Sequence, residues 1–454
     1  MIPENKNNIT IVGAGLAGSL MAIYLSRKGY SVDIFERRPD MRTGNASGGR
    51  SINLALSARG IYSLEEVGLY DEIKKISIPM YGRMVHMTSG ELYFQRYGKD
   101  DSEYINSVSR AELNKSLMDT AELDKNINFY FNYKCDGFNF VDGELKLFNE
   151  DTKEHSWLER NRVIAADGAF SAVRNEMLKH TRFNYGQEFE NYGYKELTIP
   201  PGDGNSFLLE KNALHIWPRG SYMLIALPNI DGSFTCTLFL AHEFSLGGIN
   251  SFEFLKDERK VEEFLAENFP DAFSLIPDPA AEFFQNPTGN LVTVKCYPWS
   301  FEDKIVLLGD SAHAIVPFFG QGMNAAFEDC SCLNDLIGRN KDDWKTAFDE
   351  FQKLRKANTD AIADLARENF TEMRDLVATP RFQLKKKIET ELQKRYPKKF
   401  IPKYSMVTFM RIPYSEAMKR GKSQDEILDE LTENVSGIEQ VDWNLAKTLI
   451  QKML

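Results

Sequence analysis

The sequence predicts an α/β protein with a Rossmann-like nucleotide-binding domain, a second β-sheet domain and a C-terminal helical region. Three observations support this fold class. A glycine-rich motif near the N-terminus follows an apolar strand and opens a helix. Apolar and aromatic runs broken by Pro, Gly and Asn occupy the middle of the chain. From Asp342 onward the pattern of apolar residues is helical.

The first motif is Gly13-Ala-Gly15-Leu-Ala-Gly18. It follows the strand 9–12 and opens a helix that we expect to run to Lys28, so the N–H groups at the helix start can face a pyrophosphate. Gly13 makes the turn tight, Gly15 lets a phosphate approach, and Gly18 lets the helix pack on the strand. The order of strand, motif and helix predicts nucleotide binding.

A second apolar strand, 31–35, ends at Glu36, about twenty residues past the last glycine. A carboxylate at this place can accept hydrogen bonds from a ribose, which favours an adenosine without a 2′-phosphate. This half of the pattern does not separate FAD from NAD.

The second motif, Leu308-Gly309-Asp310-Ser-Ala-His313, favours FAD. Asp310 follows the strand 304–308 at the place where the ribitol hydroxyls of a flavin would lie. An ordinary capping aspartate would explain Asp310 alone, but not the glycines in Pro317-Phe-Phe-Gly320-Gln-Gly322-Met-Asn324. Those glycines let the backbone approach a flat ring, and a helix starting at about Met323 puts its positive end nearby. His313 is interpreted as a structural residue of this loop.

A third element, Arg162 to Arg174, reads as strand, turn and helix around Asp167-Gly168. The three motifs in this order resemble the single-component FAD-dependent aromatic hydroxylases built on the p-hydroxybenzoate hydroxylase fold, in which the Asp-Gly element serves both FAD and NADPH. The resemblance is closest to the kynurenine-hydroxylating members and covers nearly the whole chain to about residue 415. Four segments carry this closer resemblance. Those segments are 108–114, 215–219, 317–324 and 327–330.

The resemblance implies a reaction and its cofactors. NADPH reduces the flavin, O2 adds at flavin C4a, and the hydroperoxide oxygen attacks L-kynurenine to give 3-hydroxy-L-kynurenine. NADPH is implied by the resemblance alone, since the chain has no second dinucleotide motif. Phe319, Gly320 and Gln321 are expected to shape the site of oxygen transfer, and no general base is assigned. The expected FAD contacts are Gly13, Gly15, Gly18, Glu36, Arg110, Asp310, Gly322, Met323 and Asn324.

A β-hairpin is predicted over Met80 to Tyr97. A three-residue loop at 89–91 sets Arg83 opposite Tyr97 on one face, whereas a two-residue loop separates them. We expect the first register, because the resemblance implies that this pair holds the substrate carboxylate. An Arg offers a planar fork to such a group. Spacing alone favours a surface strand with a solvated Arg83.

A long helix is predicted from Trp344 to Val377, and Asn369 falls inside its apolar stripe between Leu365 and Met373. The residues of this predicted stripe are Phe348, Phe351, Leu354, Ala361, Ile362, Leu365, Met373 and Leu376. A buried, unpaired amide costs about 1 to 3 kcal/mol, so Asn369 needs a partner. A backbone carbonyl is one candidate. The resemblance implies instead a bound amino acid, with Asn369, Met373 and Tyr404 joining Arg83 and Tyr97 around it.

The composition of the chain limits which binding partners and which cell compartment are expected. The net charge of -11 disfavours nucleic acids and anionic membranes. The five cysteines show no paired spacing, which suggests a reducing compartment. The histidines and cysteines also show no spacing typical of metal ligands, so no metal is predicted. The polar start and the lack of a membrane-length apolar run predict a cytoplasmic protein without an anchor. The oligomeric state stays open.

The motifs also predict the domain organisation. Segments 1–72, 105–182 and 288–340 are expected to form a discontinuous FAD domain, with 73–104 and 184–287 as a substrate-side sheet and 341–454 as the helical region. Strands are expected at 207–209, 215–217, 222–227 and 234–240, with a cleft beside the FAD domain. Two alternatives remain: the same chemistry on another aromatic carboxylate, or a flavin-bearing regulatory protein that oxidises NADPH.

Overall fold

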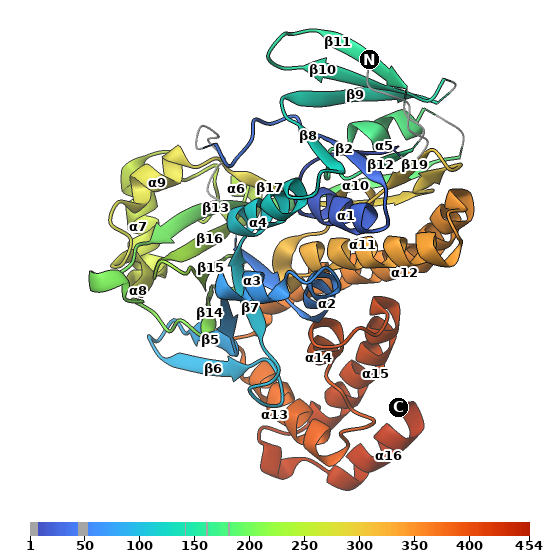
Figure 1. Ribbon diagram of the computed structural model, residues 1–454. Helices are drawn as coiled ribbons and strands as arrows, with labels where there is room; N and C mark the ends of the chain where they lie inside the picture. Colours follow the sequence, from blue (N-terminus) through green and yellow to red (C-terminus); the bar gives the residue numbers. More distant parts are fainter. Residues whose placement is uncertain (1–7, 44–52, 141, 160–161, 180–181) are drawn as a thin grey trace. The chain divides into compact units, whose positions relative to one another are not determined.

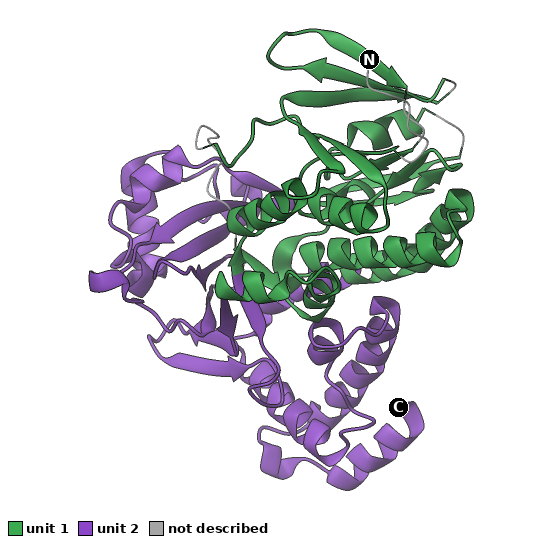
Figure 2. Cartoon of the chain, viewed as in Figure 1, with its two compact units in different colours: residues 1–76, 108–189, 292–363 green, residues 77–107, 190–291, 364–454 purple. Residues whose placement is uncertain are grey.

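The computed structural model describes residues 8–43, 53–140, 142–159, 162–179 and 182–454. The chain forms two compact units (Figure 2). The first comprises residues 1–76, 108–189 and 292–363, and the second comprises residues 77–107, 190–291 and 364–454. The C-terminal helices therefore fall in the same compact unit as the strands from the middle of the chain.

The first unit contains a six-stranded sheet with the order β18-β19-β12-β1-β2-β8 (Figure 1). All neighbours run parallel except the short β18, which pairs antiparallel with β19. Residues 9–12 and 305–307 are fully buried, as expected of a parallel sheet covered on both faces. The strands are β1 Asn8–Val12, β2 Ser31–Phe35, β8 Ile127–Tyr130, β12 Val163–Ala165, β18 Ser300–Phe301 and β19 Ile305–Leu307.

Helices of the first unit pack around this sheet. α1 (Leu16–Arg27) contacts both α4 (Arg110–Glu122) and α11 (Gly322–Arg339), and α2 (Ala58–Glu66) also packs on α11. A small antiparallel sheet, β9 to β11, contacts α5 through β9. The remaining elements are β3 Asn53–Leu56, β9 Tyr133–Asn139, β10 Glu144–Asn149, β11 His155–Glu159, α3 Tyr70–Lys75, α5 Ala172–Met177, α10 Asp310–His313 and the first part of α12 Trp344–Thr371.

The second unit contains a seven-stranded sheet with the order β17-β13-β16-β15-β14-β5-β6. β14 and β5 are parallel, whereas β14, β15 and β16 form an antiparallel meander. The seven strands are β5 Gly82–His86, β6 Leu92–Arg96, β13 Asn184–Ile199, β14 Ala213–Pro218, β15 Met223–Pro228, β16 Phe234–Ala241 and β17 Gly289–Tyr297. Strands β4 Ser77–Met80 and β7 Ile105–Ser109 pair with each other in a separate small sheet.

Two apolar cores stabilise the second unit. One joins strands β13 to β16 to the helices after the short α6 (Phe244–Gly247), which are α7 Glu258–Asn268, α8 Pro270–Phe273 and α9 Pro279–Gln285. The other lies among the C-terminal helices, through Ile388, Ile427 and Ile450. Those helices are α13 Pro380–Arg395, α14 Lys403–Thr408, α15 Tyr414–Thr432 and α16 Trp443–Met453.

The predicted fold class is confirmed, but one predicted strand is wrong. Residues 207–209 form no strand. Phe207 instead places its ring edge-on against Phe234, and Leu209 packs beside it on the same core. This run is apolar because its side chains pack against the edge of the core. A local sequence pattern does not distinguish such a loop from a strand.

The predicted hairpin is present, but its register differs by two residues. Arg83 pairs with Gln95 rather than Tyr97, and Met87 pairs with Glu91 around a loop at 88–90. The loop starts one residue early because its last position is left-handed, and Gly90, with φ +83°, occupies it. Tyr97 lies two residues beyond Gln95, so the prediction that Arg83 and Tyr97 share a face still holds.

The long helix also departs from its predicted stripe. α12 ends at Thr371 and continues as a π-helical turn, Glu372–Leu376. Leu354 and Leu376 are 55% and 45% exposed, whereas Asn369 is buried as expected. Separately, no helix in the described ranges combines the length and apolar composition needed to cross a membrane.

Candidate active site

The turn between β1 and α1 has the geometry that the glycine motif predicts. Gly13 has φ +102°, and a Cβ there would lie 2.5 Å from the carbonyl oxygen of Ala166. A Cβ on Gly18 would collide with the carbonyl oxygen of Gly13. Gly15, in contrast, has no atom within 4 Å of its Cβ position. Two glycines are therefore required by packing, and the third faces open space at a helix N-terminus.

Glu36 follows β2 and lies against this turn. Its Oε2 accepts a hydrogen bond from the N–H of Ala14 at 2.9 Å, and Oε1 accepts from the N–H of Arg38 at 3.0 Å. Each carboxylate oxygen keeps a further lone pair for a sugar hydroxyl. Asn114 on α4 donates to the carbonyl of Ala14 at 3.1 Å, while its buried Oδ1 has no hydrogen-bond partner among the described residues.

The second motif forms strand β19, a left-handed Gly309 and the one-turn helix α10. Asp310 begins α10 and is exposed, so its carboxylate is available to an external hydroxyl donor. Arg110, the first residue of α4, is exposed as well. These two side chains are accessible, as the prediction of FAD contacts requires.

The glycine loop is held by the side chain of Asn324, which was predicted as an FAD contact. Its Oδ1 accepts from the N–H of Ser57 at 2.9 Å, and its Nδ2 donates to the carbonyls of Ala55 and Gly320 at 2.8 Å each. Asn324 therefore shapes the loop, and its side chain is occupied by protein backbone. Gly320 supports this turn with φ +65°.

The other predicted residues of this loop are mostly buried. Phe319 and Met323 are covered, and Gln321 is 1% exposed and donates from Nε2 to the hydroxyl of Ser57 at 3.2 Å. Gly322 is the first residue of α11, and a Cβ there would meet Ile315 at an ordinary 3.6 Å. The structure thus shows Gln321 bound to the protein itself.

Taken together, these residues fit FAD. An open glycine at a helix start suits a pyrophosphate, Glu36 keeps acceptor capacity beside it, and the orphaned Oδ1 of Asn114 lies next to the same turn. Asp310 adds an exposed acceptor at a second turn.

An ion network behind the second motif was missed by sequence reasoning. Asp329 on α11 is fully buried and accepts from the N–H of Gly309 at 3.1 Å, from His313 Nε2 at 2.5 Å and from Arg355 Nε at 2.6 Å. Burial opposes its charge, but His313 and Arg355 more than offset this, so the pKa of Asp329 lies below its ordinary value. The only sequence signal was an acid on a helix face among buried residues.

Glu328 extends this network. It pairs with both Arg355 and Arg59, and Arg59 belongs to α2. The network thereby ties α2, α10, α11 and α12 together within the first unit. The ring of His313 is used as a hydrogen-bond partner of Asp329, which supports its interpretation as a structural residue.

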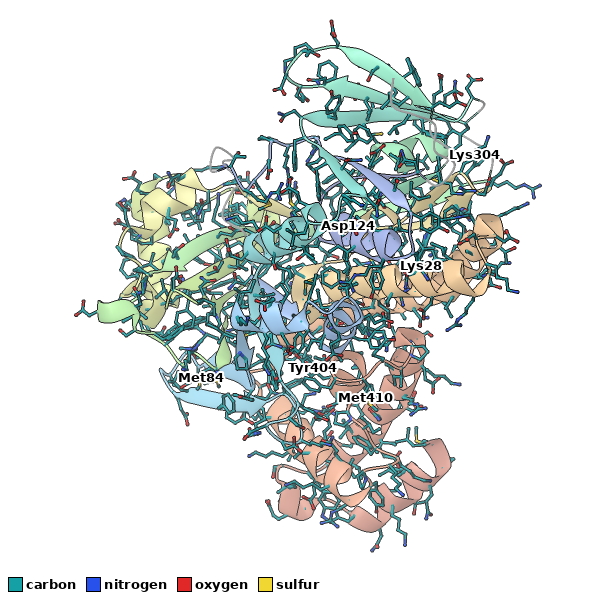
Figure 3. All side chains as sticks on the ribbon, in the orientation of Figure 1. Lys28, Met84, Asp124, Lys304, Tyr404 and Met410 are labelled. Atoms are coloured by element: carbon teal, nitrogen blue, oxygen red, sulfur yellow. The ribbon has the colours of Figure 1, made fainter. Side chains whose placement is uncertain are left out.

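In the second unit, Arg83, Tyr97 and Tyr404 come together although they lie far apart in sequence. The guanidinium carbon of Arg83 is 5.7 Å from the ring centre of Tyr97 and 5.5 Å from that of Tyr404. The two tyrosine rings stack, with centroids 5.0 Å apart. Figure 3 shows Tyr404 on α14 and Met84, the neighbour of Arg83, on β5.

This cluster combines a buried cation, Arg83, with two half-buried phenols, Tyr97 and Tyr404. Burial opposes the charge of Arg83, but Tyr97, Tyr404 and Glu372 offset it and raise its pKa. Burial raises the pKa of Tyr97 despite the opposing effect of Arg83, and burial together with Tyr97 raises that of Tyr404 well above its ordinary range. The phenols therefore stay protonated and can donate hydrogen bonds to an anion.

Asn369 lies near the end of α12, and Met373 lies four residues later in the π-helical turn that follows. The amide Nδ2 of Asn369 is 3.4 Å from the Sδ of Met373, and both side chains are buried. Glu372, which sequence reasoning did not single out, lies between them in sequence and has an Oε1 3.6 Å from Nη1 of Arg83.

A chain of polar side chains lies behind the strand that carries Arg83. His215 Nε2 is 2.8 Å from the carbonyl of Glu210, which only accepts, so this nitrogen carries the proton. Its Nδ1 therefore accepts from His86 Nε2 at 2.9 Å, and His86 Nδ1 lies 2.6 Å from Asp271. His86 is three positions from Arg83 on β5 and thus on the opposite face of the sheet.

This chain predicts a pH dependence of stability. Burial lowers the pKa of His215 from 6.5 to about 4, so the unfolded chain binds a proton that the folded one refuses as the pH falls from 6.5 towards 4. The free energy of unfolding should decrease over that window by up to about 3 kcal/mol. Urea unfolding at a series of pH values measures it, and His215→Gln should flatten the slope whereas the exposed His155→Gln should not. Equal slopes in all three proteins would remove His215 as the cause.

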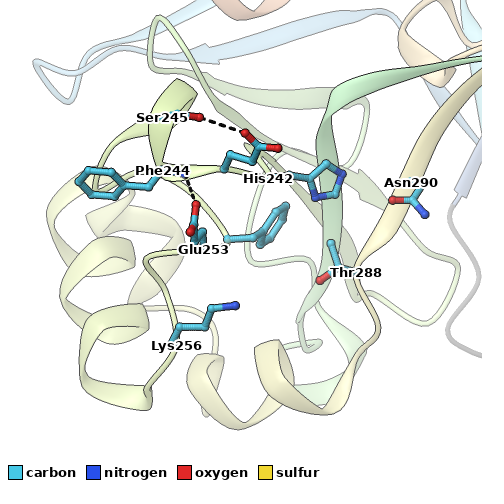
Figure 4. A pocket seen from close by; sticks show the side chains of 9 residues that line it. His242, Phe244, Ser245, Glu253, Lys256, Thr288 and Asn290 are labelled. Atoms are coloured by element: carbon cyan, nitrogen blue, oxygen red, sulfur yellow. Dashed lines mark hydrogen bonds between the residues drawn. The ribbon is translucent and has the colours of Figure 1, made fainter.

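A separate hollow of about 800 Å³ opens in the second unit (Figure 4). Glu243 and Glu253 on its wall accept hydrogen bonds from Ser245 and from the N–H of Phe244. It contains none of the predicted site residues. In the part of the chain that is described, no group of His, Cys, Asp and Glu is arranged to hold a metal ion.

Comparison with known proteins agrees with this geometry. Residues 6–188 match a family model described as an FAD binding domain. Kynurenine 3-monooxygenase of Myxococcus xanthus is 48% identical over 454 residues, covering 100% of this chain and 97% of its own. The enzyme of the same name from Flavobacterium johnsoniae is 49% identical, covering 97% of each chain.

A solved structure of 2-methyl-3-hydroxypyridine-5-carboxylic acid oxygenase shares the fold, with a TM-score of 0.66 and 19% identity. It covers 83% of this chain and 95% of that one. With near-half identity along its full length to relatives of one name, this chain belongs to the kynurenine 3-monooxygenase family.

Proposed function

We propose that this chain hydroxylates L-kynurenine to 3-hydroxy-L-kynurenine, using bound FAD, NADPH and O2. One oxygen atom enters the aromatic ring and the other leaves as water, while NADPH is oxidised to NADP+. The observation that carries the proposal is buried Arg83 between the half-buried rings of Tyr97 and Tyr404, because a protein without an anionic ligand has no evident need to bury such a cation. The names of its full-length relatives support the same substrate.

Each part of the candidate site has a task in this reaction. Bound FAD supplies the oxygen-transfer chemistry. Arg83 offers a planar fork to the substrate carboxylate, and the protonated phenols of Tyr97 and Tyr404 add donors to it. Asn369 and Met373 line the amino-acid end in this proposal. Phe319, Gly320 and Gln321 shape the flavin side and exclude water, and they need supply no proton.

The proposal is tested by NADPH consumption of the FAD-loaded protein with and without L-kynurenine, with the product identified by its mass. Marked stimulation with a product heavier by one oxygen atom supports the proposal. Stimulation without that product would mean that L-kynurenine promotes NADPH oxidation without being hydroxylated. No stimulation would remove L-kynurenine as the substrate.

Arg83→Ala should raise the KM for L-kynurenine with little change in FAD content. Loss of one charged hydrogen-bonding contact corresponds to roughly 1.5 to 3 kcal/mol, or about tenfold to more than a hundredfold in kcat/KM. Steady-state kinetics and flavin absorbance measure the two quantities.

Arg96→Ala is the matched control. Arg96 lies on β6 of the same hairpin, and its side chain is 48% exposed beside Asp101. Arg96→Ala removes one positive charge, as Arg83→Ala does, but from the surface, and it should leave the KM for L-kynurenine unchanged. An unchanged KM in Arg83→Ala would remove Arg83 from the substrate site.

A further inference from the structure

Glu372 has an unusual relation to Arg83. Their side chains form an ion pair at 3.6 Å, which is too long for a hydrogen bond. Arg83 is buried, and the side chain of Glu372 is 24% exposed. The carboxylate therefore balances the charge of Arg83 without occupying its donors. Glu372 also begins a π-helical turn, and such turns are frequent at functional sites.

Glu372 also attracts the neighbouring cations Lys386 and Lys403, but each of them has an acid that attracts it more strongly. Lys386 binds Glu389 at 3.1 Å, and Lys403 binds Asp425 at 2.9 Å. Of the described residues, only Arg83 has a cationic nitrogen within 4.0 Å of the Glu372 carboxylate. Arg83 and Glu372 thus form a neutral pair with one positive and one negative end.

A neutral pair of this kind suits a zwitterion. A plain carboxylate bound at Arg83 would add an anion beside Glu372, and two close carboxylates repel in a site with little water. An α-amino acid carries its ammonium and carboxylate on one carbon, so its two charges are separated by only a few ångströms. Its carboxylate can meet Arg83 while its ammonium meets Glu372, which leaves the site neutral.

We propose that Glu372 receives the α-ammonium group of the substrate while Arg83 receives its carboxylate. The pair then selects an aromatic α-amino acid over the same molecule without its amino group. This inference rests on the proposed function and adds a specificity-determining residue to it.

The test compares L-kynurenine with its desamino analogue, 4-(2-aminophenyl)-4-oxobutanoate, in the FAD-loaded wild type and Glu372→Gln. Dissociation constants come from changes in the flavin absorbance, and KM values from NADPH consumption. Glu372→Gln should weaken L-kynurenine binding at least tenfold, while the desamino analogue should bind equally well or better. The wild type should prefer L-kynurenine.

Glu368→Gln is the control, because Glu368 lies one turn earlier on α12, is 54% exposed and is 3.9 Å from Lys403. Glu368→Gln should change the binding of neither ligand. Equal weakening of both ligands in Glu372→Gln would mean that Glu372 only orients Arg83, and no weakening would remove it from the site; either result overturns the inference. If wild type neither binds nor hydroxylates L-kynurenine, the proposed function itself fails, which is a distinct outcome.

Discussion

Asp329→Asn should lower the free energy of unfolding by about 3 to 5 kcal/mol at pH 7, which is the usual effect of breaking a buried ion pair. The side chain is buried and is shared by Gly309, His313 and Arg355. An amide of the same shape leaves the buried cation Arg355 with one counter-ion fewer. Because Gly309 precedes Asp310, the change should also weaken FAD binding. Urea unfolding and FAD titration measure the two effects.

Asp335→Asn is the control for this variant. Asp335 lies on the same helix, its side chain is 48% exposed, and its partner Arg339 is 3.7 Å away. Asp335→Asn should therefore change the free energy of unfolding by no more than about 0.5 kcal/mol. If Asp329→Asn proved as mild, Asp329 would contribute little to the stability of the first unit.

The pH dependence gives a second check on Asp329. Its pKa is lowered in the folded protein, so its contribution to stability is complete above the ordinary value of 3.8 and is lost as the pH falls through the lower folded value. The difference in free energy of unfolding between wild type and Asp329→Asn should therefore be constant near neutral pH and should shrink below about pH 4. A difference that persisted unchanged in acid would point to packing instead of charge.

Gly18→Ala should prevent normal folding of the first unit, with a loss of about 4 kcal/mol or more, at the upper end of single-residue effects. The new methyl group would collide with the carbonyl oxygen of Gly13, and α1 would have to leave the turn that it packs on. Thermal unfolding of the apoprotein measures this loss. A stable Gly18→Ala protein would show that the turn can open without penalty.

Gly15→Ala is the matched comparison. Its φ is an ordinary -76°, and nothing lies within 4 Å of the Cβ position, so the apoprotein should be as stable as wild type. FAD affinity should nevertheless fall at least about tenfold, which is about 1.4 kcal/mol, because the methyl group would stand where a phosphate approaches. Unchanged affinity would move the pyrophosphate away from Gly15.

Much of the first unit could be predicted because its signals are local. The strand, the glycine turn, the helix and the following strand with Glu36 are consecutive, and the structure has them where the pattern put them. The contact that requires Gly18 is with Gly13 of the same motif, whereas the contact that requires Gly13 is with Ala166, which follows β12 and is distant in sequence. The hairpin register was missed by two residues because it depends on which loop position is left-handed, and Gly90 decided that.

The chain's sequence by itself determined the fold class, the nucleotide motif and the residue types of the candidate substrate cluster. Only the tertiary structure decided which charges meet. Asp329 and Arg355 are joined through helix packing, and Glu372, in the π-helical turn after α12, meets Arg83 on β5 although the two lie nearly three hundred residues apart in sequence. Local propensity and periodicity describe neighbours along the chain, whereas a buried charge is paired by whatever side chain the packing brings beside it.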